Sequence, residues 1–145
     1  MAQSFEERFD KQVAEGFIKA SDRATGLMKY LGFRITDVGP GTLRCEMDVR
    51  EELLTPFKTL HGGAVSALCD HVLGCVCYPL MTRGQWAATT EFKINLLAPV
   101  TKGVLIADAT VLSMTKSLAV VRIDVSNEGR LAAVAQGTVT IRDPK

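Results

Sequence analysis

The sequence predicts an α+β fold in which a curled antiparallel sheet wraps around one long central helix. Apolar residues recur at three- and four-residue intervals over residues 62–77, which is the spacing of one buried helical stripe. A hairpin-like pair of strands precedes this segment, and four segments with two-residue periodicity follow it. One long helix between two sets of antiparallel strands is typical of a layered structure whose sheet covers the helix.

The predicted central helix carries two stripes of different chemistry. The first is apolar and consists of Val65, Leu68, Cys69, Val72, Leu73 and Val76. The second places very small side chains around one carboxylate and consists of Gly63, Ala67, Asp70 and Gly74, with Ser66 and Cys77 alongside. Small side chains admit a neighbouring helix or strand, and Asp70 is then a solvated helix residue. Alternatively, a ligand or partner lies along this stripe, and the spacing leaves both interpretations open.

The start of this helix, His61-Gly62-Gly63, supports the second interpretation. Unpaired N–H groups and aligned peptide dipoles at a helix N-terminus favour oxyanions. A carbonyl held between the Gly-Gly amides and Asp70 would meet donors at its oxygen and a base near its carbon. This is the outline of a hydrolase site.

The chain before the central helix is predicted to contain helix and then a hairpin. Residues 4–20 have apolar side chains at four-residue steps, with Ser4 as the N-terminal cap, and residues 27–31 suggest another helical turn. Residues 33–49 then alternate between apolar and charged side chains around a Gly-Pro-Gly turn, which predicts a hairpin with one solvent-exposed face.

Four strands are expected after the central helix, over residues 86–97, 104–112, 118–125 and 131–141. Alternation in the first strand predicts one face formed by Thr90, Phe92, Ile94 and Leu96, and an opposite face formed by Thr89, Glu91, Lys93 and Asn95. The segment Asn127-Glu128-Gly129 predicts a tight hairpin between the last two strands.

Length and composition favour a single domain over residues 1–145, with an N-terminal helical segment at about 4–31. Lys plus Arg number 17 and Asp plus Glu number 16, so the net charge of +1 argues against a nucleic-acid partner. The four cysteines form no Cys-x-x-Cys pair, and with only two histidines no metal site is expected. No signal peptide and no apolar run of membrane-spanning length are apparent, so a cytoplasmic location is expected, or the mitochondrial matrix if the protein is eukaryotic.

The element order, the opening Leu60-His61-Gly62-Gly63 and the helix carboxylate Asp70 together resemble the hot-dog fold acyl-CoA thioesterases, in particular their PaaI-like branch. The resemblance covers nearly the whole chain, from the N-terminal helix to the final Ala135-Gln136-Gly137. It implies a hot-dog fold, in which two subunits pair their sheets edge to edge and form active sites at their interface. It also implies a homodimer as the smallest active unit and a homotetramer as the expected assembly.

The resemblance implies a role for each residue of the site. The Gly62 amide would polarise a thioester carbonyl, while Asp70 of the opposite subunit would act as general base on water or as nucleophile. Thr89 falls where close relatives use a hydroxyl to orient the attacking water. Relatives usually place an Asn where this chain has Thr55, so Thr55 is either a weaker carbonyl donor or a loop spacer. His61 braces the loop or acts directly.

The implied substrate is an acyl-CoA, and no cofactor is expected beyond the coenzyme A that the substrate carries. Segment 113–118 aligns with a loop that contacts the nucleotide or pantetheine in relatives, which makes Ser113, Lys116 and Ser117 candidate binding residues. His61 and Gly63, at the start of the central helix, are further candidate substrate-binding residues. Lys116 would meet a phosphate, although a solvated hairpin lysine is an equally good interpretation. The acyl chain is expected at the end of the central helix, around residues 74–81.

Three functions remain to be compared. The leading one is hydrolysis of an acyl-CoA to a free acid and coenzyme A. The alternative is a non-catalytic acyl-CoA binding or sensor module, which the missing Asn makes conceivable. A hydratase or dehydratase is the third, but such enzymes usually pair a carboxylate with a His, and His71 adjoins Asp70 on the helix and so points elsewhere.

Overall fold

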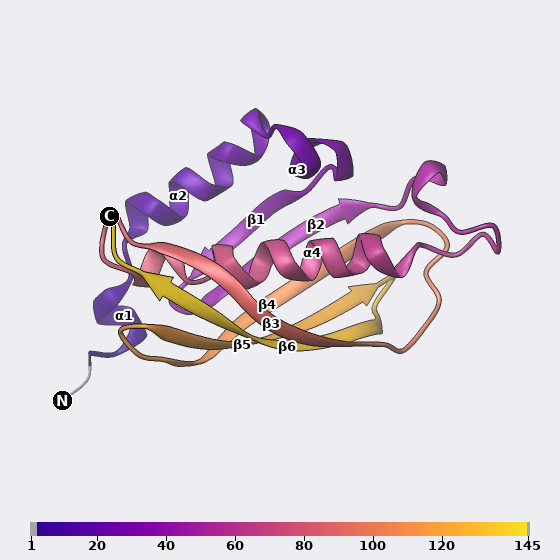
Figure 1. Cartoon of the computed structure of the whole chain (residues 1–145). Coiled ribbons are helices and arrows are strands. Elements are labelled where there is room, and N and C mark those ends of the chain that lie inside the picture. Colours follow the sequence, from indigo (N-terminus) through magenta and orange to yellow (C-terminus); the bar gives the residue numbers. More distant parts are fainter. Residues whose placement is uncertain (1–2, 145) are drawn as a thin grey trace.

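The architecture is one six-stranded antiparallel sheet that curls around a long helix, seen in a computed structural model that describes residues 3–144 (Figure 1). The strand order is β1-β2-β4-β5-β6-β3, so β1 and β3 are the two edges. The strands are β1 (Arg34–Gly39), β2 (Thr42–Asp48), β3 (Trp86–Leu96), β4 (Val104–Met114), β5 (Leu118–Asn127) and β6 (Arg130–Arg142). The predicted hot-dog arrangement is confirmed.

The central helix α4 (Gly62–Cys75) connects β2 to β3, and five shorter helical segments come before it in the described chain. Four of them are α1 (Phe5–Arg8), α2 (Lys11–Ala20), α3 (Gly26–Leu31) and the 3-10 turn η2 (Glu51–Leu53). A 3-10 turn η1 (Ser21–Arg23) lies between α2 and α3, and another, η3 (Tyr78–Leu80), follows α4. The predicted helical turn at residues 27–31 is confirmed as part of α3.

The concave face of the sheet encloses the apolar stripe of α4. Every residue of the predicted stripe is buried, and Leu68, Cys69, Val72 and Leu73 have no exposed surface. Facing them are buried residues of four strands, among them Met47, Leu105, Ile123 and Val139, each fully buried. Burial of each such side chain stabilises the fold by about 1.5–3 kcal/mol. The helix and the sheet therefore form a single core.

Length and composition alone would allow the segment Gly62–Leu80, at 19 residues, to cross a membrane, contrary to the expectation that no run reaches that length. In the structure, 61% of this segment is buried inside the protein. Its apolar character is accounted for by the core that the sheet forms around it.

The predicted helix over residues 4–20 is wrong in one respect, because it is broken at Phe9 and Asp10. Asp10 is extended and caps α2, since its carboxylate accepts from the amides of Gln12 at 3.0 Å and Val13 at 3.2 Å. Its other oxygen accepts from Arg83 at 3.0 and 2.9 Å, and these bonds lower the pKa of the Asp10 carboxyl. The tertiary contact with Arg83 supports a cap that apolar periodicity alone could not reveal.

The predicted faces of β3 are confirmed from Glu91 onward but wrong for Thr89 and Thr90, because the strand contains a bulge between Thr89 and Glu91. Thr89 lies opposite the buried Val139 and Phe92 lies opposite Gly137, whereas Glu91 lies opposite Thr138. A bulge inserts one residue and reverses the alternation beyond it. Thr89 therefore shares the concave face with Phe92 and Ile94, and Thr90 faces outward, where its hydroxyl contacts that of Thr140.

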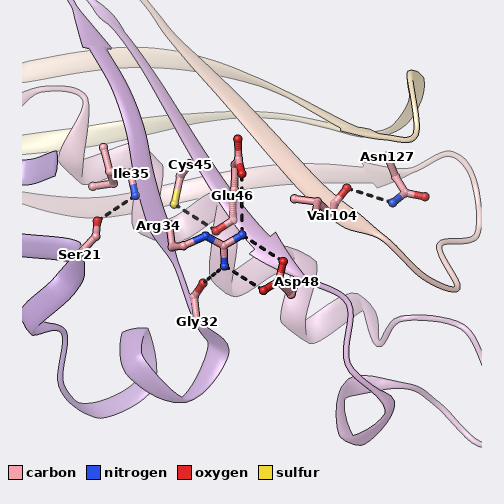
Figure 2. A network of polar contacts seen from close by, with 9 residues as sticks. All are labelled: Ser21, Gly32, Arg34, Ile35, Cys45, Glu46, Asp48, Val104 and Asn127. Atoms are coloured by element: carbon pink, nitrogen blue, oxygen red, sulfur yellow. Dashed lines mark hydrogen bonds and ion pairs between the residues drawn. The ribbon is translucent and has the colours of Figure 1, made fainter.

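The β1 edge of the sheet is covered by the N-terminal segment (Figure 2). The hydroxyl of Ser21 accepts from the amide of Ile35 at 2.9 Å, so an edge amide that no strand pairs is satisfied. Beside it, Arg34 donates two hydrogen bonds of 3.0 Å to Asp48 and lies 3.8 Å from Glu46. The N-terminal segment thus protects this edge from pairing with another chain.

The hairpin predicted at residues 127–129 is confirmed, and it joins β5 to β6. Glu128 has φ of 49° and Gly129 has φ of 77°, the two positive values that a tight hairpin turn requires. The Asn127 side chain is buried and donates to the carbonyl of Lys102 at 2.9 Å. It also donates to the carbonyl of Val104 at 3.1 Å (Figure 2). This side chain ties the turn to the start of β4.

Two glycine substitutions test the packing of the fold in opposite directions. A Cβ at Gly137 would lie 2.5 Å from both the Glu91 carbonyl oxygen and the Phe92 Cβ, so Gly137→Ala is expected to destabilise by about 1–3 kcal/mol. A Cβ at Gly16 in α2 would meet nothing within 4 Å, so Gly16→Ala is expected to stabilise by about 0.5–1 kcal/mol. Urea unfolding of both variants measures these changes. A stable Gly137→Ala variant would contradict the tight contact at the β3 bulge.

Candidate active site

The start of α4 leaves one backbone amide available. His61 caps the helix, because its Nδ1 accepts from the amide of Gly63 at 2.8 Å. The His61 carbonyl accepts from Ala64 at 2.9 Å. Among residues 3–144, no acceptor is paired with the amide of Gly62. The helix dipole and this free N–H therefore favour negative charge on an oxygen at Gly62, while Gly63 is engaged within the cap.

An apolar pocket of about 260 Å³ adjoins Gly62. It is lined by Thr59, Leu60, Gly62, Val65, Leu96, Leu97, Ala98, Pro99, Val100, Ala132 and Ala133. A Cβ at Gly62 would lie 2.8 Å from Leu96 Cδ1, so only glycine leaves room for this side chain without displacing it. The pocket brings the helix start together with the end of β3 and the connection that follows it.

Asp70 lies on the same helix but well away from Gly62. Its side chain is exposed and forms no hydrogen bond or ion pair with the described residues. Eight residues separate the two positions, which places them about 12 Å apart along the helix axis. Reacting groups must approach to about 3–3.5 Å. The Gly62 amide and the Asp70 carboxylate of one chain therefore cannot both contact the same carbonyl group.

Thr89 lies on the concave face of β3, beside α4. The strand runs antiparallel to the helix, since Leu96 contacts Gly62 at the helix start and Ala87 donates to the Tyr78 hydroxyl at 3.2 Å beyond the helix end. Thr89 is consequently on the side of the C-terminal half of α4. Thr89 therefore lies, like Asp70, away from the helix start that carries Gly62.

A family model described as "Thioesterase superfamily" matches residues 57–134, the part of the chain that contains the helix start, Asp70 and Thr89. The chain belongs to this family.

Relatives and solved structures agree with this assignment. Human acyl-coenzyme A thioesterase 13 is 31% identical over 127 residues, which cover 85% of this thioesterase and 89% of the human protein. The 1,4-dihydroxy-2-naphthoyl-CoA hydrolase of Listeria monocytogenes is 25% identical over 118 residues, covering 81% of this chain and 96% of that protein. The Escherichia coli PaaI protein has the same fold, with a TM-score of 0.82, 24% identity, and coverage of 92% and 96% of the two chains.

Thr55 lies in the loop before α4 and uses its hydroxyl locally. The hydroxyl is 3.1 Å from that of Thr59 and accepts from the amide of Phe57 at 3.3 Å. Lys58 adopts φ of 63°, a left-handed conformation that favours glycine. Thr55 therefore stabilises a turn whose backbone is strained at Lys58, and its role as a carbonyl donor stays a prediction.

The predicted coenzyme A residues lie at the opposite end of the thioesterase from Gly62. Ser113 is near the end of β4, and Lys116 and Ser117 are exposed in the turn that leads to β5. Lys116 lines a cavity of about 620 Å³ whose walls include Arg8 of α1 and Met81 beyond α4. Within one chain, these residues and Gly62 are separated by the length of α4.

Sequence reasoning named Leu80, Met81 and Lys116, which line the larger cavity, but missed other wall residues of both cavities. Leu96 and Leu97 are 57% and 54% exposed, and their place beside Gly62 depends on how β3 pairs with β6. Arg8 reaches the Lys116 cavity because its Nε donates to the carbonyl of Leu80 at 3.1 Å. Neither contact leaves a local pattern in the sequence, since each joins segments far apart in the chain.

Two details of the predicted small stripe differ in the structure. Cys77 is fully buried, and its thiol donates to the carbonyl of Leu73 at 3.7 Å, so it belongs to the core instead of the stripe. Val76, expected to line an acyl channel, is 1% exposed and is packed in the core. Leu80 and Met81, expected to line the same channel, are lining residues of the Lys116 cavity.

The thiols of this thioesterase are unreactive, and its described residues offer no metal centre. Cys45, Cys69, Cys75 and Cys77 are free and buried, and burial raises the pKa of each thiol to about 12. Within residues 3–144, no group of three or more His, Cys, Asp or Glu side chains is arranged to hold a metal ion. A thiol with such a pKa carries almost no thiolate at neutral pH.

His71, next to Asp70, is half-buried and makes stability depend on pH. Its ring lies 5.0 Å from that of Phe33, and its Nε2 is 3.8 Å from the Cys75 sulfur. Burial lowers the pKa of the imidazole below its ordinary 6.5, and the nearby Asp70 charge only partly opposes this. The unfolded chain then binds more protons than the folded one just below pH 6.5.

The free energy of unfolding is therefore expected to fall as the pH falls below about 6.5, with a weaker dependence in His71→Asn. Urea unfolding between pH 7.5 and pH 5 measures both slopes. Equal slopes in wild type and His71→Asn would contradict the assignment to His71.

Proposed function

We propose that this thioesterase hydrolyses an acyl-CoA to a carboxylic acid and coenzyme A at a site shared by two copies of the chain. Membership of the thioesterase superfamily supports the reaction class. Acyl-CoA as the substrate is supported by the name of the human relative, which is 31% identical over 85% of this chain. The observation that carries the shared site is the separation of Gly62 from Asp70, about 12 Å along one helix.

In the proposed reaction, the thioester carbonyl lies at Gly62 of one copy, and its oxygen accepts from the free amide. Asp70 of the second copy takes a proton from water as the water oxygen bonds to the carbonyl carbon. The bond from carbon to sulfur then breaks, and the coenzyme A thiolate takes up the proton from Asp70. If Asp70 attacks the carbon itself, the carbon–sulfur bond breaks to leave a mixed anhydride, and water then cleaves this anhydride to the free acid and supplies the proton of the thiol. Thr89 of the second copy orients the water.

The rest of the substrate would extend from the apolar pocket of about 260 Å³ beside Gly62. Lys116 is the proposed partner of a coenzyme A phosphate, assisted by Ser113 and Ser117. The proposed reaction uses no cofactor, apart from the coenzyme A that the substrate itself carries. We place the enzyme in a reducing compartment, the cytosol or the mitochondrial matrix, which its four free buried cysteines support.

Binding without turnover is the alternative, and one observation favours it. The Thr55 hydroxyl is engaged with Thr59 and the Phe57 amide, so it is not free to replace the amide donor that relatives have. An acyl-CoA sensor would bind the substrate and release no thiol. A free-thiol assay over several acyl-CoA lengths, run beside a direct binding measurement, separates the two functions.

Removing the Asp70 carboxylate tests the proposed base. Asp70→Asn is expected to lower kcat by about 100-fold or more, because the amide cannot accept the proton of the attacking water. Free-thiol release under saturating acyl-CoA measures the change. Asp22→Asn, in the exposed turn η1, is the matched control and should keep the wild-type rate. Full turnover by Asp70→Asn would remove Asp70 from the mechanism.

Substitutions of Thr89 test whether its hydroxyl orients the attacking water. Thr89→Val keeps the side-chain shape but loses the hydroxyl, and kcat is expected to drop by about tenfold or more. Thr89→Ser restores a hydroxyl and should recover most of the rate. If Ser and Val at this position behave alike, the effect is one of packing on the concave face and not of water orientation.

A further inference from the structure

The N-terminal segment forms one wall of the cavity of about 620 Å³ beside Lys116. Helix α1 lies next to the turn between β4 and β5, which carries Lys116 (Figure 1). The Nε of Arg8 holds α1 there by donating to the carbonyl of Leu80 at 3.1 Å. The Phe5 ring packs on Gly41, where an added Cβ would lie 2.7 Å from it. These two contacts attach α1 to the rest of the fold.

Arg8 is a half-buried cation without an acidic partner. Among residues 3–144, no carboxylate lies within ion-pair distance of its guanidinium, and only its Nε forms a hydrogen bond. Lys116 is exposed and has no ion pair in this part of the chain either. Two such cations at one cavity favour an anionic ligand. The terminal nitrogens of Arg8 are free, and a planar guanidinium matches the oxygens of a phosphate.

The remaining walls of this cavity suit a flat aromatic group. Phe5, Met81 and Met114 present apolar side chains to it. Aromatic rings and thioethers both make favourable contacts with another ring. The volume of about 620 Å³ falls within the range of roughly 300–1,000 Å³ that small-molecule sites have. The walls therefore match a nucleoside that carries a phosphate.

The cavity lies beyond the C-terminal end of α4, on the copy that supplies Asp70 in the proposed reaction. Leu80, in its wall, follows Asp70 by ten residues, about 15 Å at the rise of a helix. In an acyl-CoA, the pantetheine arm separates the thioester from the nucleotide, so the enzyme must recognise these two groups at different places. A thioester at Asp70 and a nucleotide in this cavity are compatible with one substrate molecule.

We propose that Arg8, together with Lys116, binds the 3′-phosphate of coenzyme A and makes the enzyme select coenzyme A over dephospho-coenzyme A. The inference rests on the proposed function, in which Lys116 meets a phosphate of the substrate. A phosphate monoester carries up to two negative charges and three free oxygens, which engage both cations. Arg8 lies outside residues 57–134, which match the thioesterase superfamily, so this contact belongs to the N-terminal segment of this chain.

Glu7 also lines the cavity and opposes the binding of an anion there. Its Oε2 accepts from the amide of Ser4 at 2.8 Å, as part of the capping box of α1. A Gln at this position keeps that cap and removes the charge. Glu7→Gln is therefore expected to lower the Kd for coenzyme A by about twofold or more, because a like charge is removed.

Calorimetric titration with coenzyme A and with dephospho-coenzyme A tests the assignment. The wild type should bind coenzyme A about tenfold or more tightly than dephospho-coenzyme A. Arg8→Gln should lose most of this difference and keep the wild-type Kd for dephospho-coenzyme A. Lys116→Gln should lose a smaller part, since an exposed ammonium contributes less. Arg23→Gln, which removes an exposed cation from η1, is the matched control and should bind both ligands as the wild type does.

The pair of ligands separates phosphate recognition from a role of Arg8 in the fold. If the bond from Arg8 to the Leu80 carbonyl were its whole contribution, Arg8→Gln would weaken both ligands equally, and this result overturns the proposal. A wild type that binds the two ligands equally, or binds neither, overturns it as well. The titration uses no thioester. Selection through Arg8 without thiol release from acyl-CoA therefore refutes only the proposed hydrolysis, and hydrolysis without that selection refutes only this inference.

Discussion

The structure depends on one constraint, which is that the sheet must close around α4. The helix has a fully buried face at Leu68, Cys69 and Val72, and only a curled sheet can cover it within a chain of 145 residues. The bulge in β3 contributes to this geometry, since bulges bend a strand and increase its twist. Gly137 is required at the same point, where a side chain would collide with the bulged strand. Packing of the helix thus determines the shape of the sheet edge.

The same packing divides the proposed site between subunits. Because one face of α4 is committed to the core, Asp70 must project from the other face, toward solvent in a single chain. The free amide of Gly62 is fixed at the helix start, about 12 Å away along the axis. Because the helix is straight, its own Asp70 cannot approach the Gly62 amide at its start. In the proposed mechanism a second copy of the chain closes this gap.

Periodicity in the sequence was sufficient for the core but not for the contacts that fix the site. The buried stripe of α4 and the order of strands follow from apolar spacing, which reflects burial directly. The face of Thr89 was predicted wrongly, because a bulge reverses alternation and arises from pairing with Gly137 and Thr138, nearly fifty residues away. The break at Asp10 was missed for a similar reason, since Arg83 supports that cap across the fold. Local patterns encode burial, whereas bulges, caps and cavity walls depend on distant partners.

The loop before α4 shows how a substitution can change the chemistry of the site while preserving its geometry. Thr55 bonds to Thr59 and to the Phe57 amide, so its hydroxyl holds the turn in which Lys58 adopts a left-handed conformation. That turn fixes the approach of the chain to His61, whose ring caps the helix through Gly63. In the proposed mechanism, the carbonyl is therefore polarised mainly by the Gly62 amide and the helix dipole. The loop then acts by holding Gly62 in place.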